Sequence, residues 1–386
     1  MDRRDFLRRS ALIPVAGLGG IARAAADPTQ RRLLVLVELK GGNDGLNTVV
    51  PFADPEYGRL RPRLAIAREQ VVQLTERTGL HPALAPLKPA WDAGELAIVQ
   101  GVGYPDPNLS HFRSIEIWDT ASRSDEYLDE GWLARAIERS PCPASYAAEG
   151  VVVGAGGMGP LAGRSVRAIA LASPEQFVRN AHLAHAERAR VHNASLSHIL
   201  DVENRIAASA DRLGGARHFR TGFPAGAFGN AALAAAQLAA NPAGVAVVRL
   251  SLASFDTHAN QQAVHANLLR QLAEGLVALR SALIEADLWK RTVVATYGEF
   301  GRRPRENESG GTDHGTSSAH LVLGGAVRGG LHGAEPALRR LDGNGNLAHA
   351  VDFRAYYATF LERWWAMDSR AALGGRFAPL DLVRQT

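Results

Sequence analysis

Short, almost continuous apolar runs recur along the chain, separated by stretches in which apolar residues return every three or four positions. A continuous apolar run is typical of a strand that is buried on both faces, as in a parallel sheet covered by helices. The pattern therefore predicts strands over 31–39, 95–103, 151–157, 167–171, 244–255, 291–300 and 319–327.

Helical periodicity fills the gaps between these runs. One apolar stripe lies between 255 and 291 and consists of Val264, Leu268, Leu272, Leu276, Leu279 and Leu283. Further helices are predicted over 182–213 and 225–241, and after Asp352, which suits an N-cap. Strands that alternate with helices predict an α/β fold with a doubly wound, mostly parallel central sheet flanked by helices.

The N-terminus carries the three parts of an export signal. Arg3 and Arg4 form a twin-arginine pair, a weakly apolar stretch follows, and Ala24 to Ala26 offer a small-residue cleavage site. Residues 1–26 are therefore expected to be a removable twin-arginine signal peptide. Residues 27–386 are expected to form a single domain with a candidate cap-like insertion around 175–230.

Composition excludes several classes of protein. The formal charge of +4 falls to about +1 without the five arginines and two aspartates of the leader, which leaves no basic field for nucleic acid. No later segment is long and apolar enough for stable membrane insertion. A single cysteine, Cys142, excludes an internal disulfide and a zinc site built from cysteines.

Chemically active side chains follow four of the predicted strands. Because ligands of open α/β sheets collect beyond the carboxyl ends of strands, we expect these side chains to meet at one edge. Carboxylates and imidazoles suit zinc, manganese or iron, bound as one ion or two. The residues are Asn43, Asp44, Asp106, Asn108, Ser110, His111, Asp256, His258 and Glu299, and then Asp313 and His314 in a glycine-rich stretch.

Five motifs in order resemble the bacterial exported family of domain-of-unknown-function 1501. They are "LKGGNDGLNTVVP", "SHFRSIEIWDT", "SFDTHANQ", "GEFGR" and "GTDHGTSSAHLVLGG". That family is similar to the alkaline phosphatase/sulfatase superfamily. The resemblance implies an alkaline-phosphatase-like fold, two bound metal ions, often zinc, and a Ser or Thr nucleophile at the start of a helix.

The resemblance also implies individual roles. Asp44 matches the ligand after the first strand, and Ser110 matches the nucleophile. Asp256 with His258 and Asp313 with His314 match the later ligand pairs. In this chain Glu299 stands where the late pair normally begins, so either Glu299 or Asp313 is the late carboxylate ligand.

Neighbouring residues suggest how an anionic substrate could be held. A metal beside Ser110 would lower the pKa of its hydroxyl, and Asn108 or His111 would hold the non-bridging oxygens. Arg302 and Arg303 could pair with the anion. The alternatives are that Ser110 only caps a helix and that the arginines lie in a solvated loop.

These inferences lead to one expected function and one alternative. We expect a periplasmic or extracellular, metal-dependent hydrolase of phosphate or sulfate esters, exported by the twin-arginine translocase. Its substrate would be a small-molecule or carbohydrate anionic ester, and its metal zinc, with manganese, iron or calcium as alternatives. The other reading is a non-catalytic metal-binding protein of the same fold that serves in surface assembly or carbohydrate binding.

Overall fold

The computed structural model describes residues 32–154, 156–171, 212–213 and 217–384. The signal peptide expected over 1–26 lies outside the described residues. So do most of the insertion expected around 175–230 and nearly all of the helix expected over 182–213.

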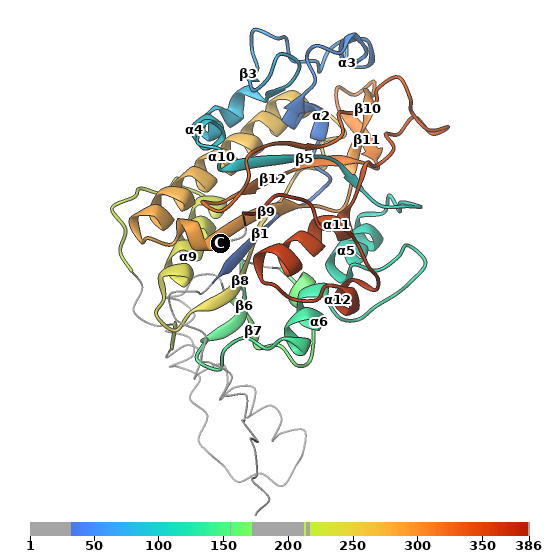
Figure 1. The fold of residues 1–386 in the computed structure, drawn as a ribbon. Helices are drawn as coiled ribbons and strands as arrows, with labels where there is room; N and C mark the ends of the chain where they lie inside the picture. The colour runs from blue at the N-terminus through green and yellow to red at the C-terminus, as the bar shows by residue number, and fades with distance from the viewer. Residues whose placement is uncertain (1–31, 155, 172–211, 214–216, 385–386) are drawn as a thin grey trace, which may run out of the picture. The chain divides into compact units, whose positions relative to one another are not determined.

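A nine-stranded sheet forms the centre of the described structure (Figure 1). The strand order is β13-β5-β12-β9-β1-β8-β6-β7, and β14 also pairs with β5. Only β12 runs antiparallel to its neighbours in this sheet, so the predicted mostly parallel sheet is confirmed. The strands are β1 Leu33–Leu39, β5 Leu96–Gly103, β6 Ala148–Val153, β7 Ala168–Leu171, β8 Val245–Leu252, β9 Thr292–Tyr297, β12 Ser318–Leu323, β13 Gly330–Gly333 and β14 Val351–Asp352.

Each of the seven predicted apolar runs overlaps one of these strands, although β6 and β12 begin before the predicted runs. β1 shows the reason, because all of its residues are buried. Its side chains alternate between two separate cores, with Val35 and Val37 in one and Leu34 and Leu36 in the other. The sequence did not predict the short strands β13 and β14 beside β5.

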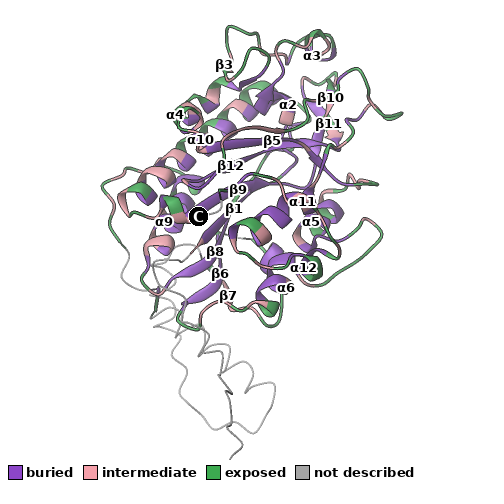
Figure 2. Cartoon of the chain, viewed as in Figure 1, coloured by how far each residue is buried: buried purple, intermediate pink, exposed green. Residues whose placement is uncertain are grey.

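Helices cover both faces of the sheet, and its strands are buried between them (Figure 2). The first core contains α9 Ala227–Ala240, α10 Gln261–Glu285, the 3-10 helix η2 Pro82–Leu87 and α4 Lys88–Asp92. The second core contains α5 His111–Thr120, α6 Trp132–Arg139, α11 Phe353–Ala358, the π-helix η5 Thr359–Trp364 and α12 Arg370–Leu373. The N-cap predicted at Asp352 is confirmed, since its side chain accepts a hydrogen bond from the amide of Arg354.

The leucine stripe predicted on α10 is buried except at its first position. Val264 is 41% exposed, so its assignment to the core was wrong. At this end of the helix the buried face is made by Gln261 and His265, which reach polar groups in the loop after β1. Polar contacts therefore replace apolar packing at the end of α10 that approaches the carboxyl edge of the sheet.

Two small sheets lie beyond the main one and were not predicted. One has the order β2-β4-β3, and the other is the antiparallel pair of β10 and β11. The latter pair, called here the hairpin, lies in a glycine-rich and charged stretch that lacks an apolar strand pattern. The remaining elements are α2 Gly45–Thr48, β2 Val49–Val50, α3 Pro55–Leu60, β3 Val72–Gln73, β4 Gly79–Leu80, η3 Gly159–Leu161, η4 Trp289–Arg291, β10 Gly301–Glu306 and β11 Thr312–Gly315.

None of the described helices combines the length and the hydrophobicity that a bilayer crossing requires.

A buried ion pair fastens the loop after β1. The carboxylate of Asp44 caps α2 and lies 2.6 Å from a guanidinium nitrogen of Arg61, and neither side chain is exposed. Complete burial acts to raise the pKa of Asp44, but Arg61 outweighs this effect and holds the pKa below its ordinary value. Arg61 also donates to the carbonyls of Arg303 and Pro304, so the pair connects the first loop to the hairpin.

We expect Arg61→Met to lower the free energy of unfolding by about 3–5 kcal/mol, because it leaves the carboxylate of Asp44 buried without its counter-charge. Urea denaturation at neutral pH would measure this loss. The matched change Arg59→Met, at an exposed arginine of α3 two residues before Arg61, should leave stability nearly unchanged. Because the pKa of Asp44 is depressed in the folded state, its contribution is present above pH ~4 and is lost as the pH falls through the folded pKa. Equal losses in both variants would contradict a structural role for the buried pair.

Candidate metal centre

Three segments bring histidines and a carboxylate together at the carboxyl edge of the sheet. The segment after β5 provides His111, which is the first residue of α5. The segment after β8 provides Asp256 and His258, and β11 of the hairpin provides His314. The convergence expected for side chains that follow different strands is therefore observed for these four residues.

Donor atoms of His111, Asp256 and His314 all lie within 4.8 Å of one another, and His258 adjoins Asp256 and His314. One carboxylate oxygen of Asp256 lies 3.1 Å from Nε2 of His258 and 3.2 Å from Nε2 of His314. The two Nε2 atoms are 2.9 Å apart, and the second oxygen of Asp256 is 3.3 Å from Nε2 of His111. Ligands that are each about 2.0–2.2 Å from a tetrahedral zinc ion lie roughly 3.3 Å from one another.

The partners of the opposite ring nitrogens orient all three imidazoles. Nδ1 of His111 lies 2.9 Å from the carboxylate of Glu299, and Nδ1 of His314 lies 2.9 Å from the carbonyl of Leu109. Nδ1 of His258 lies 3.4 Å from a carboxylate oxygen of Asp313. These partners can only accept, so each neutral ring carries its proton on Nδ1 and presents the Nε2 lone pair to the centre.

Lone pairs that face one another at 2.9 Å repel unless a proton or a cation lies between them. Two further atoms show that the group is incomplete within the described structure. Nε2 of His111 and the second carboxylate oxygen of Glu299 are buried and have no hydrogen-bond partner among the described residues. The donor set and its spacing therefore fit a divalent cation.

Arg302 determines the charge state and position of Asp256. A guanidinium nitrogen of Arg302 lies 2.6 Å from the Asp256 carboxylate, which is itself 45% exposed. Partial burial acts to raise the pKa of Asp256, but Arg302 and His314 lower it to about 2. Burial also lowers the pKa of His314 below its ordinary value, which favours the neutral ring that a metal requires.

The loops approach one another so closely that one of them requires glycine. Gly41 has a φ of +113°, and a Cβ at this position would lie 2.5 Å from the backbone nitrogen of Asp256. The amide of Gly41 donates to the same oxygen of Glu299 that holds His111. This glycine thus joins the loop after β1 to the segments that carry the donors.

Ser110 lies between two residues that belong to the centre. It is exposed, it occupies the N-cap position of α5, and its side chain makes no capping hydrogen bond. The preceding carbonyl, of Leu109, binds His314, and the following residue is His111. Asn108 accepts a hydrogen bond from the amide of Ser110 and so fixes the turn into the helix.

The remaining expected site residues lie around this group. The Asp44 carboxylate accepts from Arg61, Gln261 and two backbone amides, and it does not join the four donors. Glu299 and Asp313, the alternatives for the late carboxylate, each contact the Nδ1 atom of a histidine.

The two arginines expected to bind substrate are already engaged in the fold. The buried Arg302 donates to Asp256 and to backbone carbonyls of three segments. The carbonyl of the half-buried Arg303 accepts a hydrogen bond from Arg61. The Nε of Arg303 is buried without a hydrogen-bond partner among the described residues.

Sequence reasoning missed the groups that hold the donors in place. It gave no role to Arg61, Gln261 or the carbonyl of Leu109, and it expected His111 to hold substrate oxygens and did not name it as a metal ligand. The available signal was the position of His111 directly after a strand-end loop, which it shares with the other donors.

The family described as "Protein of unknown function (DUF1501)" matches residues 90–372, a range that contains all four donors. No curated protein matches the chain significantly.

Several solved structures resemble the described fold at low identity. Ps i-CgsB has a TM-score of 0.44 and 10% identity over 90% of this chain and 75% of its own. The C-terminal periplasmic domain of EcEptC from Escherichia coli, in complex with Zn, has a TM-score of 0.34 and 10% identity over 76% and 73%. A protein in the alkaline phosphatase superfamily from Vibrio parahaemolyticus has a TM-score of 0.34 and 8% identity over 78% and 62%. At these scores the likenesses assign neither a substrate nor a reaction to this chain.

We expect Glu299→Ala to weaken zinc binding by about 10–100-fold, because Nδ1 of His111 loses the acceptor that orients the ring. Competition with a chromophoric chelator would measure the affinity. Glu308→Ala is the matched control, since Glu308 is an exposed residue of the turn between β10 and β11. Unchanged affinity in the Glu299 variant would show that His111 is not held as a ligand.

Proposed function

We propose that this chain, which belongs to the family described as "Protein of unknown function (DUF1501)", is an exported metal-dependent hydrolase of phosphate or sulfate esters. One observation carries the proposal. Three imidazoles present Nε2 to a single carboxylate, while each Nδ1 faces a group that can only accept. Such a set binds a cation, and its position at the carboxyl edge of the sheet is where open α/β sheets carry their sites.

The proposed ligands are His111, Asp256, His258 and His314. Zinc suits a set of three imidazoles and one carboxylate, and iron or manganese share this ligand preference. A bound divalent cation would polarise an ester oxygen and lower the pKa of a nearby hydroxyl. Glu299 and Asp313 then act as positioning residues, since each orients the ring of one ligand.

Ser110 is the proposed nucleophile. Its hydroxyl is exposed at the start of a ten-residue helix, where free backbone amides favour a bound anion. The hydrogen bonds made by Leu109 and His111 fix the backbone on both sides of it. Asn108 lies beside the same helix end and could contribute its amide NH₂ group to a bound anion, because its side-chain oxygen is already occupied.

The proposed ester substrate is inferred from the four ligands and Ser110, and not from Arg302 and Arg303. Arg302 is committed to Asp256 and to backbone carbonyls, so we assign it to positioning the ligand loop. Arg303 is half-buried in strand β10 of the hairpin and stays a candidate for contact with an anionic ester.

A second function shares the same centre: a metal-binding protein without turnover, which serves in surface assembly or carbohydrate binding. The observation that favours it is the surroundings of Ser110. The Ser110 hydroxyl has no hydrogen-bond partner among the described residues, and thus no base to take its proton. The two functions make the same prediction for metal content and opposite predictions for ester cleavage.

Ser110→Ala should abolish ester hydrolysis and retain the metal, because the change removes the nucleophile and none of the ligands. A screen of aryl phosphate, phosphodiester and aryl sulfate, combined with elemental analysis, would measure both properties. Ser309→Ala, at an exposed serine in the turn between β10 and β11, is the matched control and should keep full activity. Normal turnover in the Ser110 variant would refute the nucleophile. Metal content without any turnover in the unmodified protein would favour the second function.

His258→Ala should reduce the metal content from about one ion per chain to a small fraction, because a site left with three protein donors holds zinc less tightly. Elemental analysis after dialysis against a weak chelator would show the loss. The change His332→Ala, at a histidine of the distant strand β13, should leave the metal content unchanged. Full retention of metal by the His258 variant would remove this residue from the proposed ligand set.

A further inference from the structure

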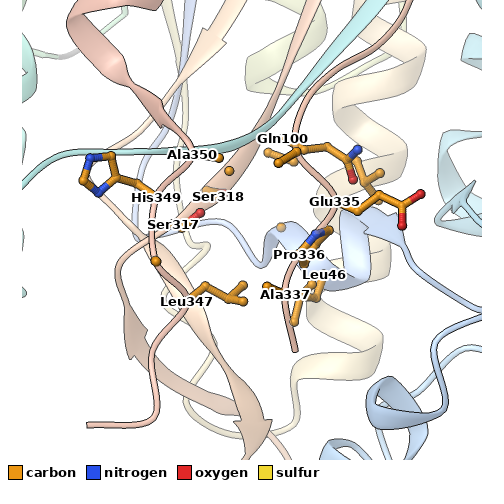
Figure 3. A pocket seen from close by; sticks show the side chains of 16 residues that line it. Leu46, Gln100, Ser317, Ser318, Glu335, Pro336, Ala337, Leu347, His349 and Ala350 are labelled. Carbon is orange, nitrogen blue, oxygen red and sulfur yellow. The ribbon is translucent and has the colours of Figure 1, made fainter. Parts of the chain in front are cut away.

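A cavity of about 190 Å³ lies next to the segment that connects the hairpin to β12 (Figure 3). Its inner wall is formed by buried residues of α2, β5 and β12. Its rim is formed by two later segments, 334–337 and 347–350, which are mostly exposed except for the buried Leu347. Figure 3 shows Gln100 above, with its amide beside Glu335, and Leu347 and Ala337 below.

Two polar side chains on the inner wall have no partner of their own. Gln100 is 4% exposed and Ser317 is 6% exposed, and both line the cavity. Among the described residues, neither the amide of Gln100 nor the hydroxyl of Ser317 makes a side-chain hydrogen bond. Their polar atoms are not among the fully buried atoms that lack a partner, so they are accessible from the cavity and free to bind a ligand there.

Apart from Ser318, His349 and Glu335, the rest of the lining is apolar. Leu46, Val49 and Leu347 face the space together with several alanines and glycines. Glu335 is the one carboxylate of the lining, which includes no lysine or arginine. An anion would therefore meet a carboxylate and neither a lysine nor an arginine, whereas a neutral molecule would meet apolar walls and polar side chains.

We propose that this cavity binds a neutral, ring-sized molecule that carries one amide or hydroxyl group. Its size supports this class, since a dry apolar cavity of roughly 150 Å³ accommodates benzene. Gln100 supplies both a donor and an acceptor, which complements a primary amide edge, and Ser317 adds a hydroxyl. This proposal does not rest on the metal centre, because none of the four proposed ligands lines the cavity.

Three matched ring compounds test the proposal: benzamide, benzoate and toluene. Titration followed by NMR should show saturable binding of benzamide at one site per chain. Benzoate should bind at least tenfold more weakly, because its charge finds no counter-ion. Toluene should also bind about tenfold more weakly, because it leaves Gln100 and Ser317 unpaired.

Two variants separate a specific site from general hydrophobic uptake. Gln100→Leu should reverse the preference, so that toluene binds more tightly than benzamide. Ala337→Trp, at the exposed rim, should block all three compounds. Ala371→Trp, at an exposed residue of α12, should not. His258→Ala should bind benzamide as the unmodified protein does, which keeps the result independent of the proposed hydrolase.

Two outcomes would overturn the proposal. One is the absence of saturable benzamide binding, which would mean that the cavity holds only water. The other is equal affinity for toluene and benzamide in both the unmodified protein and the Gln100 variant, which would leave Gln100 without a role in recognition.

Discussion

The buried guanidinium of Arg302 is the interaction on which the candidate centre depends. It donates to the carbonyls of Gly41 and Gly42 after β1, to Phe255 and Asp256 after β8, and to Thr312 in the hairpin. Three segments that are far apart in sequence are thereby fixed to one planar group. Hydrogen bonds to a charged donor are stronger than neutral ones, and a planar fork also fixes the directions of its partners. Without this link, the loop that carries Asp256 and the hairpin that carries His314 would not be held in fixed positions relative to each other.

Local charge explains why these loops can meet without repelling one another. Asp256 faces Arg302, and acceptors at Nδ1 of the three imidazoles leave each Nε2 directed to the centre. Glu299 and Asp313 place two further negative charges behind the rings. Three carboxylates and one guanidinium leave a deficit of two positive charges, which one divalent cation would balance. The arrangement thus matches a single ion in number of donors, in spacing and in charge.

The sequence predicted the central sheet because its buried strands are nearly continuous apolar runs. The run of β1 is apolar on both faces except at Glu38, so no partner had to be known to recognise it. The ends of the strands could also be predicted, and the residues that follow them include Asp256, His258 and His314. The hairpin could not be predicted from the sequence, because glycines and charged residues dominate it and its strands are stabilised by contacts with other loops.

Roles at the site were harder to predict than positions, because they depend on partners that are distant in sequence. Arg302 has the same local sequence context as Arg303, yet strand β10 turns Arg302 inward to the carbonyls of other loops. Nothing in the segment around His111 shows that Glu299 and Asp256 lie on the two sides of its ring. The histidines themselves were visible in the sequence, whereas the acceptors that set their tautomers required the fold.

Asp44 shows how the partner of a carboxylate determines whether it can bind a metal ion. It follows the first strand, where the resemblance implied a metal ligand, but its carboxylate is compensated by Arg61 and by the amide of Gln261. A guanidinium that is already paired at 2.6 Å in complete burial leaves no need for a second cation there. The described residues therefore provide donors for one ion, and the charge that a second ion would supply is provided by Arg61. In the proposed hydrolase, a centre of this kind would orient an ester from one side only, so positioning of the substrate would fall to the start of α5 and to Ser110.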